Sequence, residues 1–238
     1  MSMRTGETVF VAGAGGAIGR VLCRLLVDDG WNVVGTTRSA GRAAELRAAG
    51  VTPVVVDVFD APTLLAAVVD ASPSVVIHQL TDLPKEVTRD GLAAARPKNA
   101  RIREVGTANL VAAAVSAGAK RMVAQSIAFA YAPGPRPLRE TAPLDPAASA
   151  VEKLEDLVLN APLEGVVLRY GRFYGPNTWS PTPSGEAPVH VEAAADAARR
   201  AMTHGGRGVY NIVEDDGVVS SQKAIRDLGW HSGFRVST

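Results

Sequence analysis

Three glycines near the amino terminus have the spacing of a phosphate-binding turn. Gly13, Gly16 and Gly19 follow the apolar run 8–12 and precede a helical pattern. In such a turn, glycine permits a tight bend, a close approach of the backbone to a pyrophosphate, and close packing of helix on strand. The N–H groups at the start of the helix also favour negative charge. The pattern predicts a dinucleotide site that includes Gly13, Gly15, Gly16, Ala17, Ile18 and Gly19.

The end of the second expected strand, residues 32–37, indicates which dinucleotide binds. An acidic residue at this point binds the ribose hydroxyls of NAD, whereas a basic residue accommodates the additional phosphate of NADP. Arg38 occupies the position, and Ser39 and Arg42 add a hydroxyl and a second guanidinium. We therefore predict NADPH as the cofactor, with NADH possible but bound more weakly. The alternative is that Arg38 and Arg42 are solvated loop charges.

Residues at two further strand ends complete the expected cofactor site: Asp57, Val58, Gln79 and Leu80. Asp57 either reaches the adenine or caps the following turn. The apolar run 74–77 predicts a buried parallel strand, so the residues after it are expected beside the nicotinamide ribose. His78, at the end of this run, is expected to be packed and hydrogen-bonded rather than a base.

The composition argues against several classes of protein. The chain has 238 residues and a net charge of +1, so it can bury a sizeable core and has no basic excess for nucleic acid or a membrane surface. Its single cysteine, Cys23, cannot form an internal disulfide, and no pattern indicates a metal site. With no secretion signal or membrane-spanning run, we expect a cytoplasmic protein whose partner is a small-molecule substrate.

Strands and helices alternate along the chain, which predicts an α/β fold: a Rossmann-type, doubly wound parallel sheet of about seven strands. Residues 1–165 are expected to form an NADP-binding domain, to which strands within 166–171 and 189–213 return. A small, reduced substrate lobe or lid is expected from residues 172–188 and 214–238.

Three helical or irregular segments flank the expected substrate side. Residues 81–98 contain prolines and no clear period, which predicts a loop with a short helix. The amphipathic pattern 102–118 predicts a long helix. Its apolar face and that of the helix near 147–161 permit a homodimer without requiring one. The proline-rich stretch 177–188 is a candidate lid.

Together these segments resemble the extended short-chain dehydrogenase/reductases, the family of nucleotide-sugar epimerases, dehydratases and related ketoreductases. The resemblance covers nearly the whole chain and rests on the glycine loop, Asp57-Val58, Gly106 to Leu110, the strand that ends in Gln125-Ser126 with Tyr131 after it, and Leu168 to Pro176. It implies a bound nicotinamide dinucleotide and places Tyr174 near the nicotinamide. In the family, the tyrosine that corresponds to Tyr131 shapes the substrate pocket.

Members of this family usually donate a proton from a tyrosine paired with a lysine in the pattern YxxxK. Hydride reaches a carbonyl carbon while the proton reaches its oxygen, and the four-residue spacing puts both side chains on one helical face. In the expected helix 147–157, Ser149 stands four residues before Lys153, and a shifted register places Ala147 and Val151 on the pair. The chain contains no YxxxK.

Ser126 and Tyr131 remain as candidate catalytic residues. The family pattern places the usual catalytic hydroxyl at Ile127, so Ser126 is either a substrate contact or a hydrogen-bonded strand-end serine. The side chains expected to contact a substrate are Tyr131, Phe173, Asn177 and Trp179, with ordinary packing as the alternative.

A cofactor site without its proton-donating pair leaves three hypotheses. The leading one is an NADPH-dependent ketoreductase for a bulky, aromatic polyketide-type molecule, with the proton supplied by substrate or water. Atypical extended reductases of this kind occur in antibiotic biosynthesis, and the angucyclinone ketoreductase of simocyclinone biosynthesis is one that the chain resembles. The alternatives are a noncatalytic NADP(H)-binding sensor and a nucleotide-sugar epimerase or dehydratase. Only residues 214–221 separate the last strand from the last helix, which leaves little clamp for a nucleotide sugar.

Overall fold

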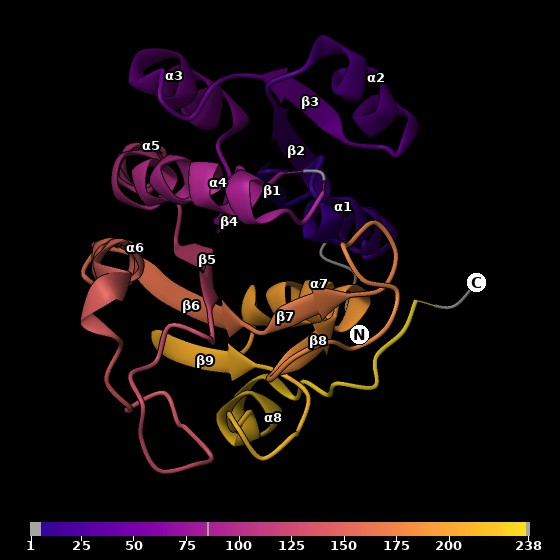
Figure 1. Cartoon of the computed structure of the whole chain (residues 1–238). Helices are drawn as coiled ribbons and strands as arrows, with labels where there is room; N and C mark the ends of the chain where they lie inside the picture. The colour runs from indigo at the N-terminus through magenta and orange to yellow at the C-terminus, as the bar shows by residue number, and fades with distance from the viewer. Residues whose placement is uncertain (1–5, 85, 237–238) are drawn as a thin grey trace.

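A parallel sheet forms the centre of the molecule in the computed structural model, which describes residues 6–84 and 86–236. Its strands are β1 (Thr8–Ala12), β2 (Asn32–Thr37), β3 (Thr52–Val55), β4 (Val75–His78), β5 (Arg121–Ile127), β6 (Glu164–Tyr170) and β9 (Gly208–Ile212). Within the described residues these seven strands lie in the order β3-β2-β1-β4-β5-β6-β9 (Figure 1). The order reverses between β1 and β4, which confirms the predicted doubly wound fold and opens a crevice at their carboxyl ends.

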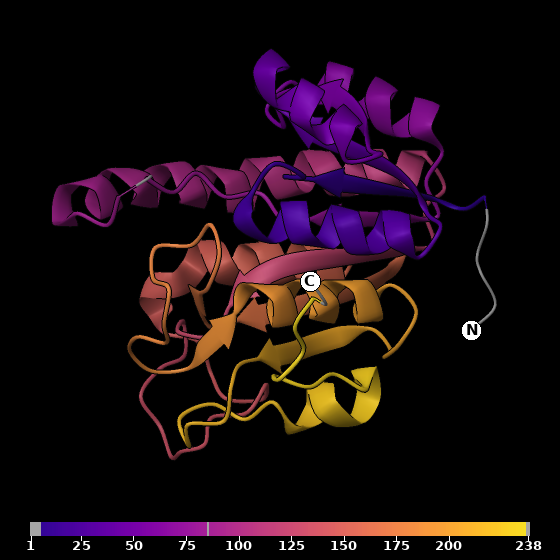
Figure 2. The same cartoon turned by 90° about the vertical axis from the view of Figure 1, so that its right-hand side faces the viewer.

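Helices cover both faces of the sheet (Figures 1 and 2). They are α1 (Ala17–Asp28), α2 (Ala40–Ala48), α3 (Ala61–Ala71), α5 (Thr107–Ser116), α6 (Ser149–Leu159), α7 (Val191–Ala201) and α8 (Gln222–Leu228). Along β1, Val9 and Val11 pack into the core that α1 and α7 cover, whereas Phe10 and Ala12 pack into the core under α3, α5 and α6. Successive strand residues point to opposite faces, so a strand buried on both faces reads as one apolar run.

The segment between β4 and α5 differs from its prediction as a loop with a short helix. Helix α4 (Arg89–Arg101) runs into a π-helical turn, η1 (Ile102–Gly106), which continues into α5. Thr88 caps the start of α4 by accepting a hydrogen bond from the Gly91 N–H at 3.0 Å. Pro97 suggested a break, but it lies inside α4, where it removes one helical hydrogen bond without ending the helix.

The expected substrate lobe contains short strands and loops beside β9, whereas its helix α8 packs into the main core through Ala224 and Leu228. Strands β7 (Arg172–Tyr174) and β8 (Pro188–His190) pair in a small separate sheet, and a 3₁₀ turn (Pro146–Ala148) leads into α6. A cluster of Ala128, Tyr131, Ala187, Val213 and Val219 forms the core of this part. The outermost residues of the expected domain division, 1–5 and 237–238, lie outside the described part of the chain.

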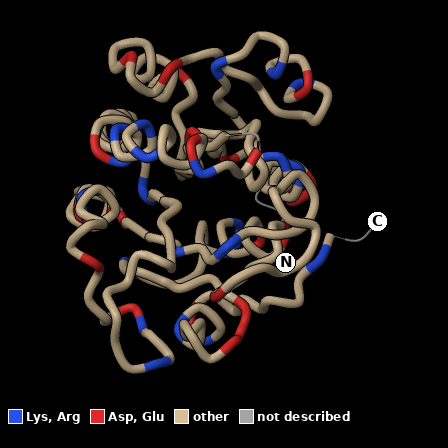
Figure 3. Tube along the Cα trace, in the orientation of Figure 1, with Lys and Arg blue, Asp and Glu red and all other residues tan. Residues whose placement is uncertain are grey.

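The described residues form neither a membrane-spanning helix nor a cluster of metal ligands. No helix there is long and apolar enough to cross a membrane, and no group of three histidine, cysteine or acidic side chains is placed to hold a metal ion. Charges of both signs are spread along the trace (Figure 3).

Candidate functional site

The glycine-rich turn after β1 is shaped by close backbone contacts. Gly13 has φ +92°, and a β-carbon there would lie 2.6 Å from the carbonyl oxygen of Gln79, which follows β4. A β-carbon at Gly19 would collide with the carbonyl oxygen of Gly13. Gly16 precedes α1, and no side chain caps this helix start. The turn therefore offers uncapped helix N–H groups in a cradle that side chains would fill, and this fits the pyrophosphate of a dinucleotide.

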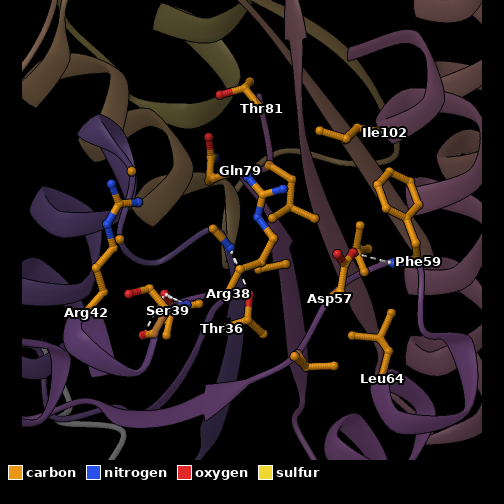
Figure 4. Close-up of a pocket in the computed structure, with 18 residues that line it drawn as sticks. Thr36, Arg38, Ser39, Arg42, Asp57, Phe59, Leu64, Gln79, Thr81 and Ile102 are labelled. Carbon is orange, nitrogen blue, oxygen red and sulfur yellow. Dashed lines mark hydrogen bonds between the residues drawn. The ribbon is translucent and has the colours of Figure 1, made fainter. Parts of the chain in front are cut away.

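A crevice extends from this turn along the carboxyl ends of β1, β2, β3 and β4 (Figure 4). Of the residues that the sequence assigns to the cofactor, those that line it are Gly13, Gly15, Gly16, Arg38, Ser39, Arg42, Asp57, Val58, Gln79 and Leu80. Ala17, Ile18 and Gly19 belong to the first turn of α1 behind the lining. The sequence did not point to Phe59, Leu64 or Ile102, which form an apolar wall beside Asp57.

Two arginines and a helix start lie at one end of the crevice. Arg38 and Arg42 both line it, with Ser39 between them at the start of α2 (Figure 4). The Ser39 side chain makes no capping hydrogen bond, whereas its N–H donates to the Thr37 hydroxyl at 3.1 Å. The Arg38 guanidinium lies 3.5 Å from the Asp82 carboxylate in an exposed ion pair. Arg38, Ser39 and Arg42 can bind the additional phosphate of NADP. The ion pair of Arg38 with Asp82 does not prevent this, because an exposed ion pair is weak enough to break when a phosphate binds.

Asp57 caps the turn that follows it, which is one of the two roles that the sequence allows, the other being a contact with the adenine. Its carboxylate accepts a hydrogen bond from the Phe59 N–H at 2.9 Å and closes the turn after β3. The same side chain lines the crevice, so this contact is compatible with a bound adenine as well. Phe59 itself lies under the guanidinium of Arg101, whose central carbon is 4.0 Å from the ring centre.

The end of β4 carries an unpartnered polar atom. Gln79 is 5% exposed, and among the described residues no partner reaches its buried Oε1. Its amide Nε2 donates to the Tyr170 hydroxyl at a long 3.4 Å. A buried acceptor without a partner is costly, and its place in the crevice wall fits a ligand donor.

His78 is a buried neutral histidine, as the sequence predicts. Its Nδ1 accepts from the Leu80 N–H at 3.2 Å, so Nε2 carries the proton and donates to the Thr107 hydroxyl at 3.0 Å. Burial lowers the pKa of His78 to about 4, with a smaller contribution from the charge of Arg103. It therefore fixes the end of β4 against α5 and is no proton donor at neutral pH.

Ser126 lies in a closed network instead of the crevice lining. Its hydroxyl donates to Glu155 at 2.7 Å, and Glu155 also accepts two hydrogen bonds from Arg169, at 2.8 and 2.6 Å. All three side chains are buried. Burial opposes the charge of Arg169, but the hydrogen bonds and charge of Glu155 raise its pKa. This placement corresponds to the strand-end alternative for Ser126.

Tyr131 is engaged on the far side of the same network. Its hydroxyl donates to Asn211 Oδ1 at 2.6 Å, and the Arg169 guanidinium lies 4.8 Å from its ring centre. Burial raises the pKa of the phenol, despite the opposing charge of Arg169. A proton-donating tyrosine beside a lysine has the opposite shift, so Tyr131 has the properties of a structural side chain.

The register of α6 follows from the Glu155 contact. Glu155 and Val151, one turn earlier, are buried on the face that packs on the sheet, whereas Ala147 is exposed and lies in the 3₁₀ turn before α6. Ser149 and Lys153 are exposed as well. Of the two pairs that the sequence suggests, 149/153 and 147/151, only Val151 faces the sheet, and it is no proton donor.

The remaining predicted contacts lie in the lobe, outside the crevice lining. Tyr174 donates to Glu214 at 2.6 Å and accepts from Arg235 at 3.2 Å. Phe173 packs on Tyr170 with 5.5 Å between ring centres, and Asn177 has φ +60° in the following turn. Trp179 is 45% exposed, and its indole N–H donates to the Pro84 carbonyl at 3.0 Å, which links the lobe to the segment after β4.

Comparison with known proteins identifies the class of this chain. Residues 13–199 match the model of a family described as NAD(P)H-binding, so the chain belongs to that family. It is 42% identical to a Streptomyces protein named 3-diazoavenalumate denitrifying reductase, over 90% of this chain and 78% of that one. The crevice thus belongs to an NAD(P)-dependent oxidoreductase.

Solved structures with the same fold include two sugar-nucleotide enzymes. The UDP-glucose 4-epimerase of Thermotoga maritima aligns with a TM-score of 0.78 at 18% identity and covers 96% of this chain and 94% of its own. The UDP-glucose 4-epimerase of Thermus thermophilus, solved with NAD, aligns with a TM-score of 0.77 at 21% identity and covers 97% and 95%. At this identity the likeness extends to the fold alone, which confirms the resemblance to the extended family at that level.

Proposed function

We propose that this protein is an NADPH-dependent reductase that replaces the diazo group of an aromatic carboxylate with hydrogen. The observation that carries the proposal is the inner face of α6, whose buried residues include no tyrosine or lysine, while Ser149 and Lys153 are both exposed. The neighbouring Ser126, Glu155 and Arg169 bind one another. Such a site is suited to a reaction in which hydride is transferred and no oxygen needs a proton.

Loss of nitrogen from an aryl diazonium group meets this condition. When bound, NADPH supplies a hydride, and the net change is ArN₂⁺ + NADPH → ArH + N₂ + NADP⁺. The new C–H bond takes the hydride electron pair, and the electron pair of the broken C–N bond leaves with dinitrogen. The relative named for denitrifying reduction of 3-diazoavenalumate supports this substrate class. A ketone, the class favoured by sequence alone, needs a proton on its oxygen and is the second candidate.

Isotopes separate these outcomes. We expect the protein to release ¹⁵N-labelled dinitrogen from ¹⁵N-labelled 3-diazoavenalumate only when NADPH is present. We also expect it to place deuterium from C4-deuterated NADPH at the carbon that loses nitrogen. Reactions without protein and with the crevice variant Gly13→Ala measure spontaneous reduction. Deuterium from D₂O in place of deuterium from the cofactor contradicts the proposal. Turnover of aromatic ketones without dinitrogen release favours the ketoreductase, and tight NADPH binding with no turnover favours a sensor.

The preference for NADPH rests on the two arginines at the crevice end. A phosphate bound by Arg38, Ser39 and Arg42 would gain charge-assisted hydrogen bonds, each worth roughly 1.5–3 kcal/mol. We expect Arg38→Ala to weaken NADPH binding about tenfold to a hundredfold and to leave NADH binding within about twofold. Arg47→Ala, an exposed change on α2 outside the crevice lining, is the control. Equal losses for both cofactors in a calorimetric titration contradict the phosphate contact.

A further inference from the structure

Arg103 is a half-buried arginine in the π-helical turn η1. It makes no hydrogen bond or ion pair with any residue that the structure describes. Burial lowers the pKa of its guanidinium, which means that its surroundings oppose the charge. Arginine nevertheless stays charged in proteins, so the group is held without a counter-charge at a cost in free energy.

Other arginines in buried surroundings have partners. Arg169 is bound by Glu155, Arg121 by Glu164 and three backbone carbonyls, and Arg199 by Asp196 and Asp29. These pairs follow the usual rule that a buried charge is compensated. Arg103 departs from the rule inside a π-helical turn, a distortion that is frequent at functional sites.

The neighbours of Arg103 locate its side chain. Asn99, one turn earlier, binds the backbone of Asp82, and Thr107, one turn later, binds His78. Both are buried, so Arg103 lies on the helix face that packs against the end of β4. Its charge also acts on His78. Ile102, the adjacent residue, lines the cofactor crevice.

The phosphate groups of the cofactor are assigned to residues other than Arg103. The glycine turn and the start of α1 lie at the carboxyl end of β1, and Arg38 and Arg42 lie beyond β2. Arg103 lies in the η1 turn, which packs against α6 rather than at the glycine turn or beyond β2. The buried carboxylate near this side, Glu155, is held by Arg169 at 2.6 Å.

We propose that Arg103 binds the carboxylate of the substrate and selects aromatic acids over their neutral analogues. The proposal rests on the function proposed above, since it assigns the anion of that substrate class to a residue of this chain. A guanidinium forks to both oxygens of a carboxylate, which also orients a flat molecule relative to the cofactor crevice.

The test separates binding from turnover. Calorimetry with NADP⁺-saturated protein compares avenalumate, the denitrified acid, with its carboxamide. For the unaltered chain we expect the acid to bind about tenfold to a hundredfold more tightly than the amide, in line with one charge-assisted contact. We expect Arg103→Leu to abolish this preference, Arg103→Lys to keep part of it, and Arg96→Leu, an exposed change on α4, to keep all of it.

Three results would overturn the assignment. They are equal binding of acid and amide by the unaltered chain, an unchanged preference in Arg103→Leu, and a matching loss of NADP⁺ affinity in that variant. Failure of the proposed function looks different, because then no labelled dinitrogen is released while the acid still binds more tightly than the amide. Thermal unfolding of each variant verifies that it is folded.

Discussion

The carboxyl edge of the sheet has two regions of opposite character. Around β1, β2 and β4, polar groups face a crevice and lack strong partners: Gln79 Oε1 is unpartnered, the start of α1 is uncapped, and Arg38 has only an exposed ion pair. Around β5, β6 and α6, Ser126, Glu155 and Arg169 satisfy one another in the interior. The first region is built for a ligand, whereas the second is built for stability.

Under the proposed function, hydride transfer depends on the first region and needs no proton donor from the second. The two regions depend on different strand ends, so changes on α6 leave the glycine turn intact. In the closed network Ser126 and Arg169 both donate to Glu155, so neither is free to donate to a substrate. The following predictions test whether the two regions are independent.

The largest effect on binding is expected at the glycine turn. Gly13→Ala forces a side chain onto φ +92° and places its β-carbon 2.6 Å from the Gln79 carbonyl oxygen. Strain and collision together should raise the Kd for NADPH at least about a hundredfold. The control is Gly206→Ala, where nothing lies within 4 Å of the added carbon. If fluorescence titration gives the same affinity for both variants, the turn does not hold the cofactor.

The largest effect on stability is expected in the second region. Arg169→Leu leaves the Glu155 carboxylate buried without its counter-charge, and this should reduce the free energy of unfolding by about 3–5 kcal/mol. The exposed pair of Arg136 with Glu186 offers the comparison, because solvent screens it: Arg136→Leu should leave the free energy of unfolding nearly unchanged. Urea unfolding measures both. The affinity of folded Arg169→Leu for NADPH should stay within about twofold, and a large loss would mean that the two regions are coupled.

His78, at the border of the two regions, makes stability depend on pH. Its pKa is about 4 in the folded chain, below its ordinary 6.5. As the pH falls, the histidine is therefore protonated in the unfolded chain before it is protonated in the folded chain. The contribution of the neutral His78 ring to the free energy of unfolding is complete above pH 6.5. It is lost as the pH falls toward 4, by up to about 3 kcal/mol. Urea midpoints between pH 5 and 8 should fall less steeply for His78→Gln, and exposed His204→Gln should keep the original slope.

The sequence predicted the fold and the crevice because both depend on local patterns. Apolar runs followed by Gly13 or Arg38 indicate strand ends, and strand ends in a parallel sheet meet at one edge. The place of Phe59 and Ile102 in the crevice lining could not be predicted, because it depends on how α4 and its π-helical turn pack beside the crevice. Pro97 was misleading, since tertiary packing keeps the helix through it. The register of α6 became clear only from the contact of Glu155 with Arg169.

The smallest expected effect tests the role of Tyr131. Tyr131→Phe removes one hydrogen bond to Asn211 and keeps the ring beneath Arg169, so it should cost about 1 kcal/mol of stability. If the reaction takes no proton from the protein, kcat for the diazo substrate should stay within about twofold in this variant. Loss of a general acid instead lowers the rate by about two to four orders of magnitude. A drop of that size, with NADPH affinity unchanged, would make Tyr131 the proton donor and extend the reacting site into the second region.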